Sequence, residues 1–249
     1  MLTEAGIFYC NGAATSSEAV ADMAIYHILL VFRNLQWTNM AARTGDSEQW
    51  LDAHRNATMT AHNPRGHTLG VIGLGNIGYT IAQKAYAAFG MKIMYNDLFQ
   101  KGSEKGKAIG ATYYKDLGEM LAISYYVCIA TPGAGGKKLI DASVLKKFMK
   151  GSRLVNIARG QLLDEEAVAD ALESGQLHAA GLDVHENEPY VSPQLTKMRS
   201  VTLTCHSAGG AIETNVGFEA LSMENVEKVL TGQKPLTPVN EHLMKNRPT

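Results

Sequence analysis

The stretch TLGVIGLGNIGYTIAQKAYAAFG, residues 68–90, carries the strongest indication of fold class in this chain. Gly73, Gly75 and Gly78 have the G-x-G-x-x-G spacing, with an apolar, strand-like run before them and a helical pattern after them. In such a turn the first glycine permits the bend, the second lets the backbone approach a pyrophosphate, and the third lets helix pack on strand. The helix N-terminus then offers N–H groups and a partial positive charge to the phosphates. The stretch predicts dinucleotide binding; the alternative is an ordinary glycine-rich turn.

The next expected strand ends beside an acidic residue. Residues 92–96 form a short apolar run, and Asp97 follows it, about 20 residues after Gly78, as dinucleotide sites require. A carboxylate at this point can accept hydrogen bonds from both ribose hydroxyls, and it repels a 2′-phosphate. Asp97 therefore favours NAD, while the nearby Lys101 keeps NADP open as the alternative.

Short apolar runs alternate with helical patterns through most of the chain. Strands that are apolar on both faces and alternate with helices indicate a parallel sheet covered on both sides. The expected fold is therefore α/β, a doubly wound parallel sheet. The expected strands are Leu69–Ile72, Lys92–Asn96, Tyr126–Ala130, Leu154–Asn156, Ala179–Asp183 and Val201–Thr204, and the expected helices are Ile77–Phe89, Leu117–Ile123, Asp141–Phe148 and Glu165–Glu173.

The two ends of the chain have a different pattern. Residues 16–42 form one long helical stretch, which has little polar relief between Ala19 and Phe32. A helix that is apolar nearly all round must be buried, either in a core or against a partner chain. A second helical segment is expected over residues 212–230, and a proline-containing tail without periodicity follows it.

Composition narrows the function classes. A net charge near −1 over 249 residues provides no basic stripe, which argues against nucleic acid as a partner. The longest apolar stretch, residues 19–32, is too short to cross a bilayer, so no membrane partner is expected. Cys10, Cys128 and Cys205 lack metal-ligand spacing, and no metal is expected. Because Cys128 and Cys205 lie in apolar runs, they predict reduced core thiols in a cytoplasmic protein.

Three ionisable residues follow later strands. They are Arg159 in VNIARGQLLDEEAV, Glu188 in GLDVHENEP and His206 in VTLTCHSAGG. Ligands of open parallel sheets bind at the carboxyl ends of strands, so these residues are candidates for one catalytic site. Each also has a structural interpretation: Arg159 as a helix-dipole contact, Glu188 as a solvated loop acid, and His206 as a satisfied core histidine.

At these residues the sequence resembles a known family. GLGNIG, VNIARGQLLDEEAVADAL, AAGLDVHENEP and CHSAGG, in this order and spacing, are similar to the D-isomer-specific 2-hydroxyacid dehydrogenases. RTGDSEQW, AHNPRGHTLG, DVHENEP and residues 211–238 most resemble the fungal D-mandelate dehydrogenase group within that family. The resemblance runs from Ala5 to Val239. It implies a Rossmann-type NAD-binding domain beside a flavodoxin-like substrate domain.

The resemblance also implies roles for the three candidates in a dimeric oxidoreductase. Arg159 would bind the substrate carboxylate, and His206 would exchange a proton with the carbonyl oxygen while hydride passes between NAD(H) and a 2-keto or D-2-hydroxy acid. Glu188 would hold the other ring nitrogen and favour the charged ring. The residues implied to hold the cofactor are Gly73, Gly75, Asn76, Ile77, Gly78, Asp97, Thr131, Pro132, Ala158, Asp183 (at the nicotinamide side) and Gly209.

Two other functions fit the same resemblance. The first is a glyoxylate or hydroxypyruvate reductase, an enzyme with smaller substrates. The second is a non-catalytic, NAD(H)-responsive dimeric scaffold similar to the C-terminal-binding-protein corepressors, because these share the three candidates. Fold alone does not separate them.

The family pattern predicts a divided chain. Residues 1–13 match the last piece of a substrate domain, residues 14–205 an NAD-binding domain with its dimerisation helix, and residues 206–249 a return to the substrate domain. We expect the upstream half of the substrate domain to be missing from this sequence. The chain would then bind NADH but catalyse poorly or not at all, because a site that is not closed leaves the keto acid poorly oriented.

Overall fold

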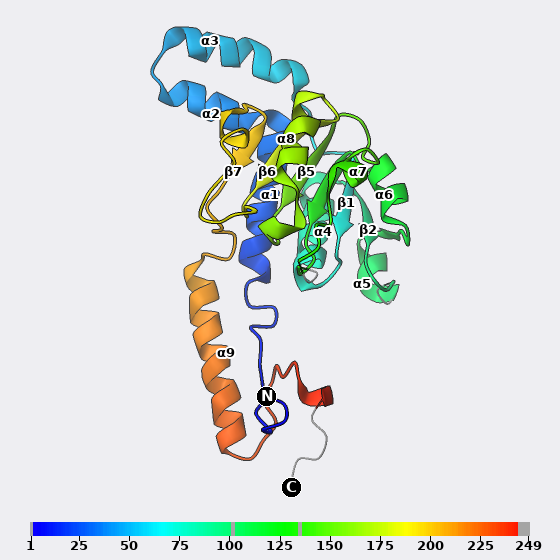
Figure 1. Cartoon of the computed structure of the whole chain (residues 1–249), viewed down its shortest axis with the longest axis vertical. Coiled ribbons are helices and arrows are strands. Elements are labelled where there is room, and N and C mark those ends of the chain that lie inside the picture. The colour runs from blue at the N-terminus through cyan, green and yellow to red at the C-terminus, as the bar shows by residue number, and fades with distance from the viewer. Residues whose placement is uncertain (1, 101–102, 134–135, 244–249) are drawn as a thin grey trace. The chain divides into compact units, whose positions relative to one another are not determined.

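The structure, a computed structural model, describes residues 2–100, 103–133 and 136–243 (Figure 1). It divides into two compact units. The large unit is Val20–Ala208, and the small unit joins Met1–Ala19 with Gly209–Thr249. All three candidate catalytic residues belong to the large unit.

The large unit is built on a parallel sheet, which in the described residues has seven strands in the order β3-β2-β1-β4-β5-β6-β7. From β1 the chain winds outward through β2 to β3, then returns to the other side of β1 and winds outward again. This doubly wound topology confirms the expected fold class. The strands are β1 Thr68–Ile72, β2 Lys92–Asn96, β3 Thr112–Tyr113, β4 Tyr126–Ile129, β5 Ser152–Asn156, β6 Leu177–Leu182 and β7 Val201–Leu203.

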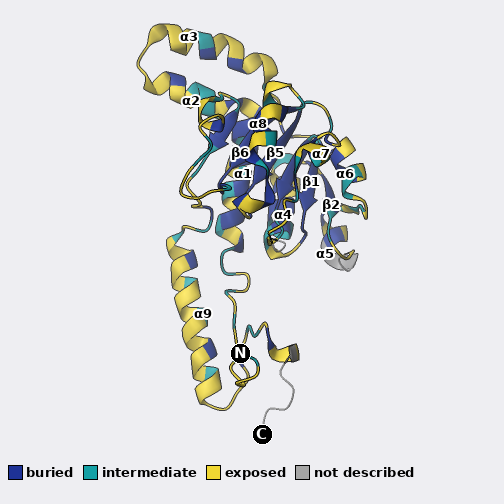
Figure 2. Ribbon diagram, in the orientation of Figure 1, coloured by how far each residue is buried: buried dark blue, intermediate teal, exposed yellow. Residues whose placement is uncertain are grey.

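Helices cover both faces of the sheet. Alternate strand residues belong to different cores: Cys128 and Val155 face the core that α1 and α4 close, whereas Val127 and Leu154 face the core that α6, α7 and α8 close. Figure 2 accordingly shows the central strands buried. The helices are α1 Ser17–Arg33, α2 Leu35–Arg43, α3 Ser47–Asn56, α4 Asn76–Phe89, α5 Ser103–Ala108, α6 Leu117–Ile123, α7 Ala142–Leu145, α8 Glu165–Glu173 and α9 Ile212–Leu230.

Several helices begin directly after an aspartate that caps the helix N-terminus. Asp116, Asp141 and Asp164 are the N-caps of α6, α7 and α8, and each carboxylate accepts a backbone N–H from the first turn. Such caps satisfy donors that a helix leaves without intrahelical partners.

The expected single helix over residues 16–42 is broken. Asn34 adopts a left-handed conformation (φ 52°) between α1 and α2. Its side-chain amide donates to Ala57 O at 2.8 Å and to Thr60 Oγ1 at 2.9 Å, so contacts distant in sequence stabilise the break. The helix expected over residues 141–148 is also shorter than predicted: α7 begins at Ala142 and ends at Leu145.

Two expectations about burial have different outcomes. The apolar helix is buried by its own chain, since Ala21, Ala24 and Ile28 of α1 are 0% exposed. Cys128 is buried in β4, as expected, but the prediction that Cys205 is a core thiol is wrong. Cys205 is exposed because β7 already ends at Leu203. No helix in the described part of the chain is long and apolar enough to cross a membrane.

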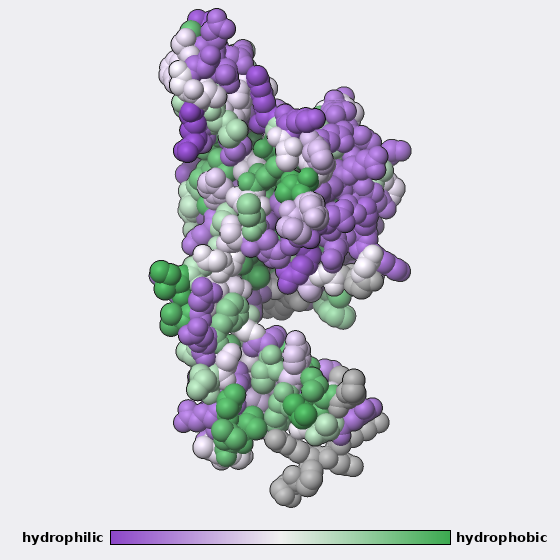
Figure 3. All heavy atoms as spheres, turned by 60° about the vertical axis from the view of Figure 1, so that its left-hand side comes forward, coloured by the Kyte–Doolittle hydropathy of each residue, from purple (hydrophilic) through white to green (hydrophobic). Residues whose placement is uncertain are grey.

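The small unit is held together by two buried asparagines. Asn225 of α9 donates to Leu221 O at 2.9 Å and accepts the Leu236 N–H at 2.7 Å, while Asn240 accepts the Tyr9 N–H at 2.9 Å. Hydrophobic side chains gather on the surface of this unit, where Ile212 is 79% and Leu230 is 81% exposed (Figure 3).

The buried histidine of α1 predicts acid sensitivity. Burial lowers the pKa of His27 from 6.5 to about 4, against the opposing attraction of Asp183. Between pH 6.5 and 4 the unfolded state therefore binds more protons at this site, so the free energy of unfolding falls as pH falls, by up to about 3 kcal/mol from His27. Urea unfolding at pH 7 and pH 4.5 measures this, and His27→Leu should flatten the dependence. Equal pH dependence in both proteins would refute the assignment.

Candidate functional site

The glycine turn lies between β1 and α4. Gly73 has φ +95°, and a Cβ there would stand 2.9 Å from Ala130 O. A Cβ on Gly78 would stand 1.9 Å from Gly73 O, so the third glycine is needed for helix to pack on strand. Gly75, the N-cap of α4, has nothing within 4 Å of its Cβ position. The second glycine therefore leaves open space at the helix N-terminus, where a pyrophosphate would bind.

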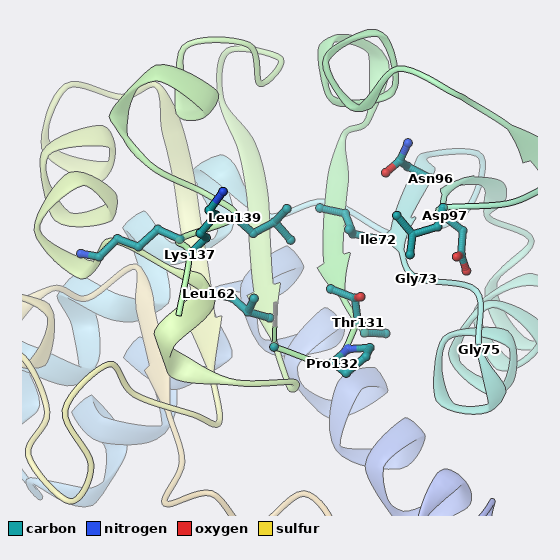
Figure 4. A pocket seen from close by; sticks show the side chains of 14 residues that line it. Ile72, Gly73, Gly75, Asn96, Asp97, Thr131, Pro132, Lys137, Leu139 and Leu162 are labelled. Carbon is teal, nitrogen blue, oxygen red and sulfur yellow. The ribbon is translucent and has the colours of Figure 1, made fainter. Parts of the chain in front are cut away.

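Asp97 forms one wall of a cavity beside this turn. The Leu74 N–H donates to Asp97 Oδ2 at 2.9 Å, which fixes the carboxylate against the glycine turn. The cavity measures about 730 Å³. Figure 4 shows Asp97 and the glycine turn along one side, Lys137, Leu139 and Leu162 along the opposite side, and Thr131 and Pro132 between them. The volume, the apolar wall and the carboxylate fit the adenosine half of a dinucleotide.

The carboxylate of Asp97 predicts cofactor preference. We expect NADH to bind more tightly than NADPH, because a 2′-phosphate beside Asp97 meets a like charge. Asp97→Asn should narrow the difference in binding free energy by about 1–3 kcal/mol, while its amide oxygen can still accept the Leu74 N–H. Calorimetric titration with both cofactors measures this. Equal affinity of the unmodified protein for NADH and NADPH would contradict it.

Glu188 and His206 form a pair beyond the ends of β6 and β7. Glu188 Oε2 lies 2.8 Å from His206 Nδ1, and Glu188 Oε1 accepts the His185 N–H at 3.0 Å. Partial burial pushes the pKa of Glu188 upward, but the hydrogen bonds from His206 and His185 outweigh this and lower it. A carboxylate only accepts, so His206 Nδ1 carries a proton.

The segment that bears His206 is attached to Asp183. The Asp183 carboxylate is 0% exposed and accepts three hydrogen bonds, from Thr204 Oγ1 at 2.7 Å, Ser207 N at 3.0 Å and Ala208 N at 2.9 Å. The His206 N–H donates to the Asp183 carbonyl. His206 also has φ 51°, which is uncommon for a residue with a side chain and costs energy. The segment is therefore rigidly placed.

Arg159 follows β5, the neighbour of β6. The Asn156 side chain donates to Arg159 O at 2.8 Å and accepts the Ala158 N–H at 3.0 Å, which fixes the backbone at this point. Arg159 is exposed, and its guanidinium donates from Nη1 to Ala158 O at 2.6 Å. A Cβ on Gly160 would stand 1.9 Å from His185 O, so this glycine lets the Arg159 loop pack against the loop that leads to Glu188. Three adjacent strands thus bring the predicted catalytic residues to one edge of the sheet.

The predicted cofactor residues occupy different places. Gly73, Gly75, Asp97, Thr131 and Pro132 line the 730 Å³ cavity. Asn76, Ile77 and Gly78 form the first turn of α4, and Ala158 is buried before Arg159. Gly209 belongs to the small unit. Sequence reasoning missed Leu139 and Leu162 in the cavity wall, which are joined by the Leu139 N–H to Leu162 O bond at 2.8 Å; nothing in the local sequence marks them.

The fold and the site define a class, the dinucleotide-binding domains with a hydrogen-bonded carboxylate–histidine pair and an arginine beyond the carboxyl ends of the strands. The family profile described as D-isomer specific 2-hydroxyacid dehydrogenase, NAD binding domain, matches residues 25–208. The chain belongs to this family, as its motifs indicate.

Individual relatives agree. A dehydrogenase of Hormonema carpetanum is 35% identical over 244 residues, and a glyoxylate reductase of Pyrococcus horikoshii is 32% identical over 246 residues. These alignments cover 96% and 98% of this chain, but 58% and 73% of the relatives. The holo structure of Rhodotorula graminis D-mandelate dehydrogenase superimposes with a TM-score of 0.94 at 42% identity, over 96% of this chain and 70% of that one. The structure of a glyoxylate reductase from Paecilomyes thermophila superimposes with a TM-score of 0.87 at 35% identity, over 97% of this chain and 70% of that one.

Proposed function

We propose that this protein is an NAD(H)-dependent D-2-hydroxyacid dehydrogenase, which interconverts a 2-keto acid and the D-2-hydroxy acid. The observation that carries the proposal is the Glu188–His206 pair, 2.8 Å between Oε2 and Nδ1, on a segment fixed by Asp183. A carboxylate that orients a histidine, beside a dinucleotide site, suits proton transfer to a carbonyl oxygen. The NADH cofactor, when bound, supplies the hydride.

The residues of the chain have distinct roles in this proposal. In the reducing direction, His206 Nε2 donates its proton to the keto oxygen as the carbonyl carbon accepts hydride. Glu188 holds Nδ1–H and stabilises the charged ring. The Arg159 guanidinium binds the substrate carboxylate through two parallel hydrogen bonds and so orients the keto group. Asp183 orders the segment at the nicotinamide side.

The proposed substrates are bulky or aromatic 2-keto acids. The likeness to D-mandelate dehydrogenase, at 42% identity, supports this class. A second candidate, glyoxylate or hydroxypyruvate reduction, is supported by the glyoxylate reductases among the relatives. NADH oxidation with phenylglyoxylate, glyoxylate and hydroxypyruvate separates the two by kcat/KM. In a protein that includes a complete substrate domain, NADH binding without turnover of any 2-keto acid would contradict both and favour a scaffold.

The proposal includes a cytoplasmic homodimer. Free cysteines suit a reducing compartment. Because α1 is buried by its own chain, the support for dimerisation comes instead from the exposed apolar side chains of the next segment, among them Met40 (58%), Trp50 (49%) and Met59 (79%). Light scattering at micromolar concentration should give twice the chain mass of 26.9 kDa. A mass equal to one chain would refute the dimer.

A further inference from the structure

Two buried histidines from different parts of the large unit converge on Thr204. His27 of α1 places Nε2 at 3.1 Å from Thr204 Oγ1, and His185 of the loop after β6 places Nε2 at 2.9 Å from Thr204 O. The His27 and His185 residues are 0% and 5% exposed. Thr204 itself stands two residues before His206, at the start of the segment attached to Asp183.

The hydrogen-bond directions follow from the groups present. The Thr204 hydroxyl donates its one proton to Asp183 Oδ1 at 2.7 Å, so it must accept from His27 Nε2–H. A ring whose pKa is lowered to about 4 by burial is neutral at pH 7, which leaves Nδ1 without a proton. Gly181 makes room for this ring, since a Cβ there would stand 2.8 Å from His27 Nδ1.

His185 has the opposite electrostatic environment. Its Nε2–H donates to a carbonyl, and its Nδ1 lies 3.5 Å from Glu165 Oε1. The Glu165 carboxylate raises the pKa of His185, against the opposing effect of burial. Glu165 is in turn held by the Glu186 N–H at 3.0 Å, and Glu186 pairs with Lys138 at 2.9 Å. His185 therefore links a fixed ionic cluster to the backbone of Thr204.

We infer that His27 and His185 are positioning residues. Their hydrogen bonds hold Thr204 in place, and Thr204 in turn determines the geometry of the nicotinamide side of the cofactor site. His27 acts through the Thr204 hydroxyl on the Asp183 carboxylate. His185 acts on the Thr204 carbonyl, and its own N–H fixes Glu188. This inference rests on the proposed function, because it takes the segment that Asp183 orders to lie at the nicotinamide side.

The test compares NADH with ADP-ribose, which keeps the adenosine and pyrophosphate but lacks nicotinamide. We expect His27→Leu and His185→Phe each to raise the calorimetric Kd for NADH about five- to tenfold, the equivalent of one hydrogen bond. The Kd for ADP-ribose should stay within about twofold. His27→Gln and His185→Gln keep a donor near Nε2 and should recover most of the NADH affinity. His178→Phe, which removes a histidine from β6 itself, is the matched control and should change neither Kd.

A double-mutant cycle tests whether His27 acts through the Thr204 hydroxyl and His185 through the Thr204 carbonyl. Thr204→Val leaves His27 untouched but removes its acceptor, so it must reproduce the selective loss for NADH. In the Thr204→Val protein, His27→Leu should raise the Kd for NADH by less than a further factor of about two. His185→Phe should raise it as much as in the unmodified protein, because His185 donates to the backbone carbonyl of residue 204, which valine retains. Equal weakening of NADH and ADP-ribose, unchanged NADH binding, or no rescue by glutamine would overturn the inference. If the unmodified protein bound neither ligand, the proposed function itself would fail.

Discussion

In a protein that includes a complete substrate domain, replacing His206 with glutamine should lower kcat/KM for 2-keto acid reduction by about 10²–10⁴, the usual contribution of a positioned acid–base group. Glutamine has a similar reach and places an amide near the position of Nε2, but it cannot release a proton to the keto oxygen. The Kd for NADH should change by less than about twofold, because the ring of His206 is not part of the cavity beside the glycine turn.

The control for this prediction is Ser207→Ala, which changes an exposed neighbouring side chain on the same segment. Only the backbone N–H of Ser207 contacts Asp183 in the described bonds, and alanine retains it. The control should keep kcat/KM within about threefold, as surface substitutions usually do. A His206→Gln protein with near-normal kcat/KM would remove His206 from the mechanism.

Replacing Arg159 with alanine should lower kcat/KM by roughly 10²–10⁴, because two hydrogen bonds between charged groups are lost at about 1.5–3 kcal/mol each. Arg159→Lys should restore only part of this, since one ammonium does not reproduce a bidentate fork. Steady-state rates with saturating NADH measure both variants. Arg159 is exposed, so neither substitution should change the melting temperature much, and an unchanged melting temperature shows that the fold is intact.

The outcome that would contradict the Arg159 assignment is full activity of the lysine variant. Equal kcat/KM in the two variants would show that charge at this position is irrelevant. A loss confined to 2-keto acids, with unchanged NADH affinity, is the pattern expected of a residue that binds the substrate carboxylate.

The sequence predicted the sheet because its strands are buried on both faces and therefore apolar throughout. It missed β3, which has only two residues, neither of them buried. The break at Asn34 was also missed, since it depends on Ala57 and Thr60, more than twenty residues away. Local patterns predict elements whose burial is continuous, and they miss those that are decided by a single distant contact.

The candidate site shows the same limit. The glycine spacing and Asp97 could be found in the sequence because each has a local consequence, a tight turn or a strand end. The Glu188–His206 pair came from family resemblance, and their roles, like that of Arg159, remain predictions. His27 and His185 gave no sign in the sequence: one stands in an apolar helix and the other in a polar loop. Only the fold brings both to Thr204.

The most direct test of the central claim uses NADH in which both hydrogens at C4 are deuterium, with phenylglyoxylate as the acceptor, and follows the label by chiral separation and mass analysis of the product. The account predicts D-mandelate with one deuterium on C2, because the hydride comes from the cofactor. Product labelling needs only slow turnover to be detected. L-mandelate or unlabelled mandelate would contradict the account, as would the absence of mandelate with a protein that includes a complete substrate domain.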